Sequence, residues 1–162
     1  MSDFTPSPLA DDTPFTATLE KASKDSINIL VVDDTPNNLR LLLKILSEEG
    51  YQVRPVTEGK MAITAAQLDP PDLILLDVKM PGMDGYEVCR QLKANECTRD
   101  VPIIFLTVLD DVVDIVKGFE LGGVDYITKP VRSEELLVRV NNQIVLRSLQ
   151  KQHIEQSALQ SG

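Results

Sequence analysis

The sequence predicts an α/β fold, a doubly wound open sheet of five parallel strands with five helices distributed over its two faces. Two observations lead to this prediction. From Ile27 onward, short apolar runs alternate with segments whose apolar residues recur at helical spacing, an order typical of βαβ units. In the third run, 72–77, apolar residues follow one another without alternation, which indicates a strand in the middle of a sheet covered on both faces.

Length, charge and apolar content exclude several classes of protein. The 162 residues are about the size of one domain, and 43% are apolar, enough for a core that needs no disulfide or metal. Acidic residues outnumber basic ones 25 to 16, and the formal charge of −9 argues against direct binding of nucleic acid. The apolar runs are far shorter than the ~20 residues that span a bilayer, and the polar start has no signal-peptide pattern. We therefore expect a cytoplasmic protein without a membrane partner.

The first elements are marked by clear boundaries. Residues 1–26 combine prolines with Ser, Thr and Asp and lack apolar periodicity, so we expect a disordered leader. The run 27–32 predicts the first strand. In the following segment Thr35 suits a helix N-cap, Pro36 suits the first helical position and Gly50 suits the residue just past the end. A helical apolar face supports this assignment: Leu39, Leu42, Leu43 and Leu46.

The second and third pairs of strand and helix are predicted in the same way. A weaker strand, 51–56, precedes a short helix that Pro70 and Pro71 end. The spacing of this helix predicts an apolar side: Met61, Ala65 and Leu68. After the central strand 72–77, another helix shows a shared apolar face: Gly85, Val88, Cys89 and Leu92. Cys89 and Cys97 lack a CxxC pair or neighbouring histidines, so reduced thiols are expected.

The last two strands and helices complete the pattern. The run 101–106 predicts a fourth strand ending at Thr107, and 124–128 predicts a short fifth strand. The helix between them has a face expected in the core: Val112, Ile115, Val116 and Phe119. Ser133 is expected to cap the last helix. Helix-forming residues continue past Arg147 to about Leu159, either as a frayed tail or as the first turns of a coiled coil that joins or pairs modules.

Polar residues gather where the predicted strands end. Asp33 and Asp34 follow the first strand, Asp77 ends the third, Thr107 ends the fourth and Lys129 follows the fifth. Ligands of open parallel sheets bind beyond the carboxyl ends of the strands, so these side chains are expected to share one site. Converging carboxylates repel one another unless a cation neutralises them, and oxygen ligands without His or Cys favour Mg²⁺. With a lysine and a hydroxyl beside it, Asp77 is the expected nucleophile for phosphoryl transfer.

Five sequence elements in order resemble the receiver domain of two-component response regulators, over residues 27 to about 147. They are Leu30-Val31-Val32-Asp33-Asp34, Leu75-Leu76-Asp77, Met80-Pro81-Gly82-Met83-Asp84-Gly85, Thr107 and Lys129-Pro130. The resemblance implies a CheY-like fold with strand order 2-1-3-4-5 and a cis Lys129-Pro130 peptide. Residues 148–162, which lie beyond the resemblance, are expected to form a helical extension or linker.

The resemblance also implies residue roles and partners. Asp77 accepts phosphate from a histidine kinase or phosphotransfer protein. Asp33, Asp34, Asp77 and the backbone carbonyl of Lys79 arrange Mg²⁺, while Lys129 contacts the phosphate. Thr107 and Tyr126 match the family's switch pair. A homodimer through the face of the fourth helix, fifth strand and fifth helix, or through the C-terminal helix, is a further expectation. The protein is then a switch and not an enzyme, apart from its own phosphorylation and dephosphorylation.

One position, Val108, departs from the family's commonest pattern, and other functions stay open. Val108 stands where Ala, Ser or Gly usually follows the switch Thr, and its branched side chain is expected to crowd the phosphate. The chain is also compatible with the N-terminal receiver of a hybrid histidine kinase or another multidomain signalling protein. A haloacid-dehalogenase-like phosphatase is the distant alternative, but it needs a second Asp two residues after the first. Here Thr35 follows Asp33 and Lys79 follows Asp77 at that spacing.

Overall fold

A computed structural model gives the structure of residues 26–108 and 112–161. Apart from Ser26, the leader expected at 1–26 lies outside the described residues. Strands and helices alternate along the chain in this order: β1 Asn28–Val32, α4 Pro36–Glu48, β2 Gln52–Val56, α5 Gly59–Leu68, β3 Leu73–Asp77, α6 Gly85–Ala94, β4 Ile103–Val108, α7 Val112–Glu120, β5 Asp125–Lys129 and α8 Ser133–Ser161. Each strand and helix predicted from the sequence is present.

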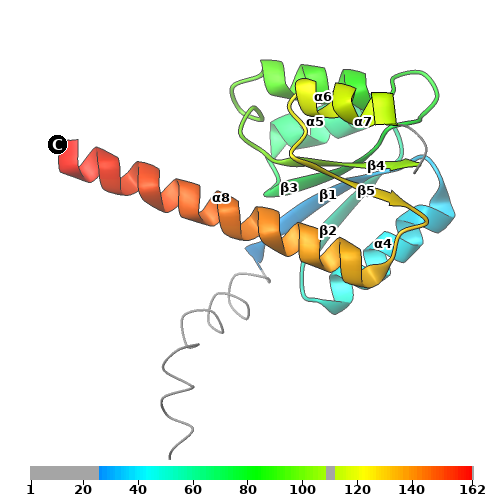
Figure 1. The fold of residues 1–162 in the computed structure, drawn as a ribbon, viewed down its shortest axis with the longest axis horizontal. Helices are drawn as coiled ribbons and strands as arrows, with labels where there is room; N and C mark the ends of the chain where they lie inside the picture. Colours follow the sequence, from blue (N-terminus) through cyan, green and yellow to red (C-terminus); the bar gives the residue numbers. More distant parts are fainter. Residues whose placement is uncertain (1–25, 109–111, 162) are drawn as a thin grey trace, which may run out of the picture.

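The sheet has the expected topology. Its strands pair in parallel in the order β2-β1-β3-β4-β5. Helices α5, α6 and α7 cover one face and α4 and α8 cover the other (Figure 1). The doubly wound α/β fold is therefore confirmed, and the carboxyl ends of all the strands lie at one edge.

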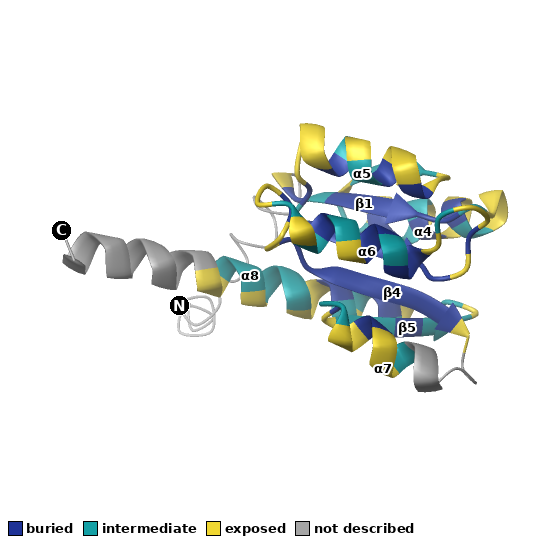
Figure 2. Cartoon of the chain, turned by 90° about the horizontal axis from the view of Figure 1, so that it is seen from above, coloured by how far each residue is buried: buried dark blue, intermediate teal, exposed yellow. Residues whose placement is uncertain are grey.

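The core consists of two apolar layers separated by the sheet. Successive strand residues point to opposite faces, so Ile74 and Leu76 of β3 pack toward α5 and α6. Leu73 and Leu75 pack toward α4 and α8. All residues of β3 are buried, and the strand lies between two helical layers (Figure 1). Figure 2 shows that β1 and β4, which pair with β3, are also buried along most of their length. The prediction of a central strand at 72–77 is confirmed.

Helix α5 buries a different face from the one predicted. Met61 and Leu68 are 49% and 81% exposed, and Ala65 is half-buried. The buried positions are the smallest residues of the helix: Gly59, Ala62 and Ala66. A Cβ atom on Gly59 would lie 2.8 Å from the side chain of Val88 in α6, so the backbones approach too closely for larger side chains between them.

The prediction of a core face on α7 is wrong for two of its residues. Val116 is 51% exposed and Phe119 is 45% exposed, while Ile115 is half-buried. The side chain of Val112 lies outside the described residues. Gly118 is the buried contact, because a Cβ atom there would lie 2.8 Å from the Phe105 ring. The helix rests on that ring through its glycine, which leaves Val116 and Phe119 accessible on the flanks.

The helix ends differ from the predictions in detail. Thr35 occupies the N-cap position of α4, but its side chain makes no capping hydrogen bond. Helix α8 begins at Ser133 itself, and the backbone N–H of Leu136 donates to the carbonyl oxygen of Arg132, so Ser133 is not the cap. The extension predicted beyond Arg147 is helical through Ser161, as expected.

Candidate functional site

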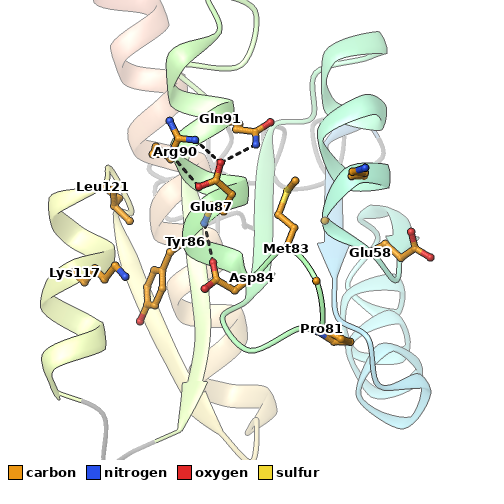
Figure 3. A pocket seen from close by; sticks show the side chains of 13 residues that line it. Glu58, Pro81, Met83, Asp84, Tyr86, Glu87, Arg90, Gln91, Lys117 and Leu121 are labelled. Atoms are coloured by element: carbon orange, nitrogen blue, oxygen red, sulfur yellow. Dashed lines mark hydrogen bonds and ion pairs between the residues drawn. The ribbon is translucent and has the colours of Figure 1, made fainter.

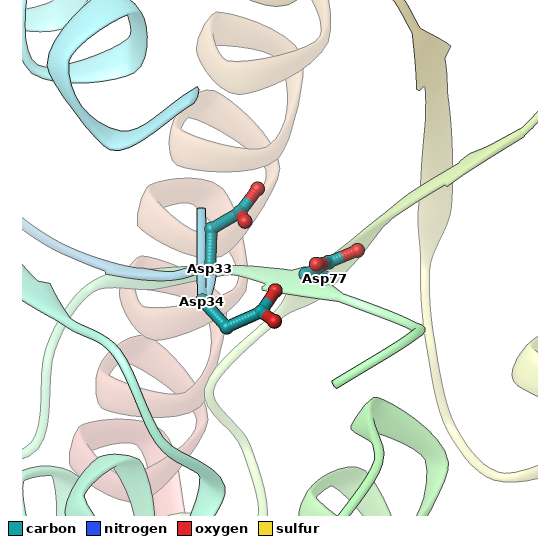
Figure 4. Close-up of side chains that lie close together, drawn as sticks. All are labelled: Asp33, Asp34 and Asp77. Atoms are coloured by element: carbon teal, nitrogen blue, oxygen red, sulfur yellow. The ribbon is translucent and has the colours of Figure 1, made fainter. Parts of the chain in front are cut away.

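The edge formed by the strand ends carries three carboxylates. Asp33 and Asp34 follow β1, and Asp77 is the last residue of the neighbouring β3. Each offers an oxygen within 4.8 Å of the others (Figure 4). The structure therefore brings together the acidic residues that the sequence assigned to one site.

Lys129, the last residue of β5, reaches this cluster. Its Nζ donates to Oδ1 of Asp77 at 2.7 Å and lies 3.6 Å from Oδ2 of Asp33. The peptide between Lys129 and Pro130 is cis, as the family resemblance implied. One ammonium group thus faces three carboxylates, and the cluster keeps an excess of negative charge.

The two oxygens of Asp33 have different environments. Oδ1 accepts a hydrogen bond of 2.9 Å from the backbone N–H of Thr35. Oδ2 is buried without a hydrogen-bond partner, and the residue is fully buried. The Nζ of Lys129, at 3.6 Å, is too far away to donate a hydrogen bond to Oδ2, and a cation in direct contact with this oxygen would supply the missing interaction.

Burial raises the pKa of Asp77 from 3.8 to about 6, an effect that the Lys129 hydrogen bond opposes and the charges of Asp33 and Asp34 increase. The direction shows that burial, more than the neighbouring charges, disfavours the ionised form of Asp77. A divalent cation bound by these oxygens would remove this penalty. Oxygen ligands from carboxylates suit Mg²⁺, so the residues present fit this metal.

Gly85 packs closely against the backbone of Asp77, a contact that the sequence analysis did not predict. A Cβ atom at Gly85 would lie 2.3 Å from the backbone carbonyl oxygen of Asp77, and the N–H of Gly85 donates to the carbonyl oxygen of Val78. Only glycine permits this approach. Gly85 follows Asp84, the residue whose side chain caps α6 by accepting a hydrogen bond from the N–H of Glu87.

The expected switch residues are Thr107, at the end of the strand beside Asp77, and Tyr126 of β5. Their side chains lie on the face of the sheet that α7 covers. Thr107 is buried, and Tyr126 of β5 is half-buried. Both line a cavity of ≈ 10 Å³ together with Phe105 and Phe119, room for about one water molecule. The Tyr126 ring packs edge-on against Phe119 at 6.0 Å, and the guanidinium of Arg139 lies 5.8 Å from its centre.

Val108 and Lys79 lie at the accessible side of the site. Val108 is 48% exposed, and the β4–β5 register pairs it with Lys129, so both side chains leave the same face of the sheet. Lys79, two residues after Asp77, is exposed. This placement is compatible with the crowding expected of Val108.

A larger hollow, of ≈ 850 Å³, lies among α5, α6 and α7 (Figure 3). Its lining includes none of the predicted site residues. Glu87, at its centre, accepts hydrogen bonds from Arg90 and Gln91, so this carboxylate is paired with its own neighbours. The carboxylate cluster, and not this hollow, is the candidate functional site.

Comparison with known proteins agrees with this assignment. A family model described as the response regulator receiver domain matches residues 29–141. Response regulator PleD of Caulobacter vibrioides is 46% identical over 117 residues, which are 72% of this chain and 26% of PleD. The DNA-binding response regulator MtrA of Mycolicibacterium smegmatis is 45% identical over 112 residues, 69% of this chain and 48% of MtrA. The chain thus spans about a quarter to a half of these relatives' lengths.

The solved structures that resemble this chain include a receiver domain with a bound metal. The receiver domain of sensor histidine kinase PA1611 from Pseudomonas aeruginosa is 35% identical, with a TM-score of 0.68, and the match covers 73% of this chain and 97% of that one. Its crystal structure has a magnesium ion coordinated in the active-site cleft. In the part of the chain that the structure describes, every helix is too short or too polar to cross a membrane.

Proposed function

Since this chain belongs to the response regulator receiver domain family, we propose that it is a signalling switch that takes a phosphoryl group onto Asp77. The switch comprises residues 27–147, with 148–162 as a helical extension. The observation that carries the proposal is the contact between Lys129 and Asp77 inside a cluster with Asp33 and Asp34. A histidine kinase or a phosphotransfer protein is the proposed donor.

The proposed reaction is a phosphoryl transfer between a histidine and an aspartate. An oxygen of Asp77 forms a bond to phosphorus while the bond from phosphorus to the donor's imidazole nitrogen breaks, and that nitrogen takes up a proton. Lys129 holds an oxygen of the transferred group by a charge-assisted hydrogen bond. Water later hydrolyses the acyl phosphate and regenerates Asp77.

Magnesium would be held by Asp33, Asp34 and Asp77, with the backbone carbonyl of Lys79 as a further ligand. The ion, when bound, supplies positive charge to the phosphoryl oxygens. The buried Oδ2 of Asp33, which accepts no hydrogen bond, and the raised pKa of Asp77 support this assignment.

The phosphate is proposed to act through Thr107 and Tyr126. The Thr107 hydroxyl is drawn inward to donate a hydrogen bond to the phosphate, and Tyr126 turns into the space that it leaves. Because the cavity between them has room for only about one water molecule, the ring can enter only if its neighbours in α7 move. The face formed by α7, β5 and α8 therefore changes and is the proposed surface for a phosphorylation-dependent homodimer.

A second candidate function concerns the protein as a whole. PA1611 is a histidine kinase with a receiver domain of this fold, which supports a hybrid kinase or another multidomain signalling protein as the second candidate. Direct DNA contact by this chain is not proposed, because its formal charge of −9 would be repelled by phosphates, although the relative MtrA is named as a DNA-binding regulator.

The proposal is tested with acetyl phosphate, a small phosphodonor that needs no kinase. Intact-mass spectrometry should show the gain of one phosphate in the presence of Mg²⁺ and none in a chelator. Asp77→Asn should show no gain, whereas Asp69→Asn, a matched change at an exposed carboxylate, should behave like the parent. An equal gain in Asp77→Asn would refute the assignment of Asp77.

A further inference from the structure

Tyr86 of α6 borders both the small cavity beside Thr107 and the large hollow among α5, α6 and α7. Its side chain is only 7% exposed, and its ring packs against the Phe105 ring with the two centroids 5.5 Å apart. Together with Thr107 and Tyr126 it lines the cavity. The same side chain lines the hollow, so Tyr86 forms a wall between the two spaces.

The ring of Tyr126 needs more room than the cavity offers when it turns inward. The cavity holds about one water molecule, and a movement of α7 frees only the side that this helix covers. The Phe105 ring has no space to move into, because Cβ atoms at Gly118 and Gly123 would lie 2.8 and 2.4 Å from it. Tyr86 borders the hollow of ≈ 850 Å³ and does have such space. Tyr86 is therefore the wall that can yield to the incoming ring.

Lys117 of α7 holds the Tyr86 ring from the side of the hollow. Its Nζ lies over the ring, 4.8 Å from the ring centre (Figure 3). The ring attracts an ammonium group at this distance, and such a contact at an exposed position changes an equilibrium about two- to fivefold. Because Lys117 belongs to α7, a movement of this helix takes the ammonium group away from the ring. The contact therefore links the position of α7 to that of Tyr86.

We propose that Tyr86 is a positioning residue of the switch, a role that rests on the proposed function of Thr107 and Tyr126. In the unphosphorylated protein Lys117 keeps the Tyr86 ring in place, and the cavity stays closed to Tyr126. When α7 moves, the ammonium group leaves and the Tyr86 ring shifts toward the hollow, so that Tyr126 can enter. Lys117 and Tyr86 thus determine how often the unphosphorylated protein adopts the switched conformation.

The first test measures the affinity of the protein for fluoroberyllate, a phosphoryl analogue, in the presence of Mg²⁺. A ligand that prefers the switched conformation binds more tightly in proportion to the fraction of the protein that already has this conformation. Lys117→Met removes the ammonium group but keeps an unbranched side chain, so it should lower the dissociation constant about two- to fivefold. Lys60→Met is the matched control, because Lys60 lines the same hollow and the change removes the same charge, and this variant should bind like the parent. An affinity of Lys117→Met no higher than the parent's, or an equal gain in both variants, would overturn the proposal.

The second test follows the Tyr126 ring itself. The protein contains three tyrosines, so labelling with 3-fluorotyrosine gives three fluorine resonances, which single replacements by Phe assign. A soluble gadolinium chelate broadens each resonance according to the exposure of its ring. In the parent, Tyr126 is half-buried and should become protected when fluoroberyllate binds. Tyr86→Leu removes the wall, so Tyr126 should be protected before fluoroberyllate is added, whereas Tyr86→Phe keeps the ring and should behave like the parent.

The outcomes of the second test separate a positioning role from packing alone. If Tyr86 only packs, Tyr86→Leu should lower stability and leave Tyr126 as exposed as in the parent, and this result would contradict the proposal, as would equal protection in Tyr86→Phe. Should Tyr86→Leu fail to fold, the affinity of Lys117→Met decides. Lys117→Met should still gain one phosphate from acetyl phosphate on Asp77. Unchanged affinity in a variant that gains this phosphate would reject the role of Tyr86 alone, whereas a parent that gains no phosphate would refute the proposed function.

Discussion

Replacement of Asp77 by Asn is expected to stabilise the metal-free protein at neutral pH while abolishing phosphorylation. The pKa of this carboxyl rises from 3.8 to about 6 on folding, mainly because the group is buried. Each pKa unit corresponds to ~1.4 kcal/mol, so the ionised carboxylate lowers the free energy of unfolding by at most about 3 kcal/mol. Asn has nearly the same shape but no charge, and it removes this penalty.

The pH dependence follows from the direction of the shift. Well below pH 4 the carboxyl is protonated in both states and the penalty is absent. As the pH rises from about 4 to 6, the unfolded chain releases its proton before the folded chain does, which favours unfolding, and above pH 6 the whole penalty is present. The advantage of Asp77→Asn should therefore be small near pH 4 and largest above pH 6.

Urea unfolding in a chelator, followed by circular dichroism at a series of pH values, measures this effect. With a slope of about 2 kcal/mol per M, the midpoint of Asp77→Asn should rise by about 1 M at neutral pH. Asp69→Asn changes a carboxylate that is 75% exposed and should show little difference at any pH. The reasoning is refuted if Asp77→Asn is no more stable than the parent at neutral pH, or if its advantage is the same near pH 4.

Three further predictions concern the metal, the switch and the access of water. Asp33→Asn and Asp34→Asn should each weaken Mg²⁺ binding at least tenfold, because each removes a charged ligand or a group that orients a ligating water. Titration calorimetry measures this affinity, and an unchanged affinity in both variants would exclude the role. Thr107→Ala should accept phosphate but lose most of the coupled change in α7; chemical-shift changes in α7 as large as the parent's would contradict the switch. Val108→Ala should speed both the phosphorylation of Asp77 and the loss of the phosphate after donor removal, because the γ-methyl groups of Val108 no longer crowd the site. Phosphate loss at an equal or slower rate in the variant would reject crowding.

The clustering of the site residues at the strand ends could be predicted, because it follows from the order of strands and helices along the chain. Once apolar runs mark parallel strands, the residues after them meet at one edge, and Asp33, Asp77 and Lys129 were placed correctly on that ground alone. The charge balance of the site depends on burial. Repulsion among the converging carboxylates was expected from the sequence, but the largest cause of the raised pKa of Asp77 is burial, which the sequence pattern does not give. The missing hydrogen bond at Oδ2 of Asp33 likewise depends on the fold.

Helix faces were less predictable where two apolar stripes compete. In α5 the larger side chains of Met61 and Leu68 favoured one face, but the close approach of α6 at Gly59 selected the face with small residues. In α7 the contact with Phe105 runs through Gly118, which periodicity of large apolar residues does not detect. Spacing identifies a helix and its stripes, whereas the packing distance decides which stripe is buried.

The central claim is that Asp77 itself carries the phosphoryl group. The most direct measurement treats the protein with acetyl phosphate and Mg²⁺, reduces the acyl phosphate with borohydride and maps the product by tandem mass spectrometry. Reduction converts a phosphorylated aspartate to homoserine, and the account predicts this product at position 77 in proportion to the phosphate gained. Homoserine at position 33 or 34 instead, or phosphate gain without homoserine at position 77, would contradict it.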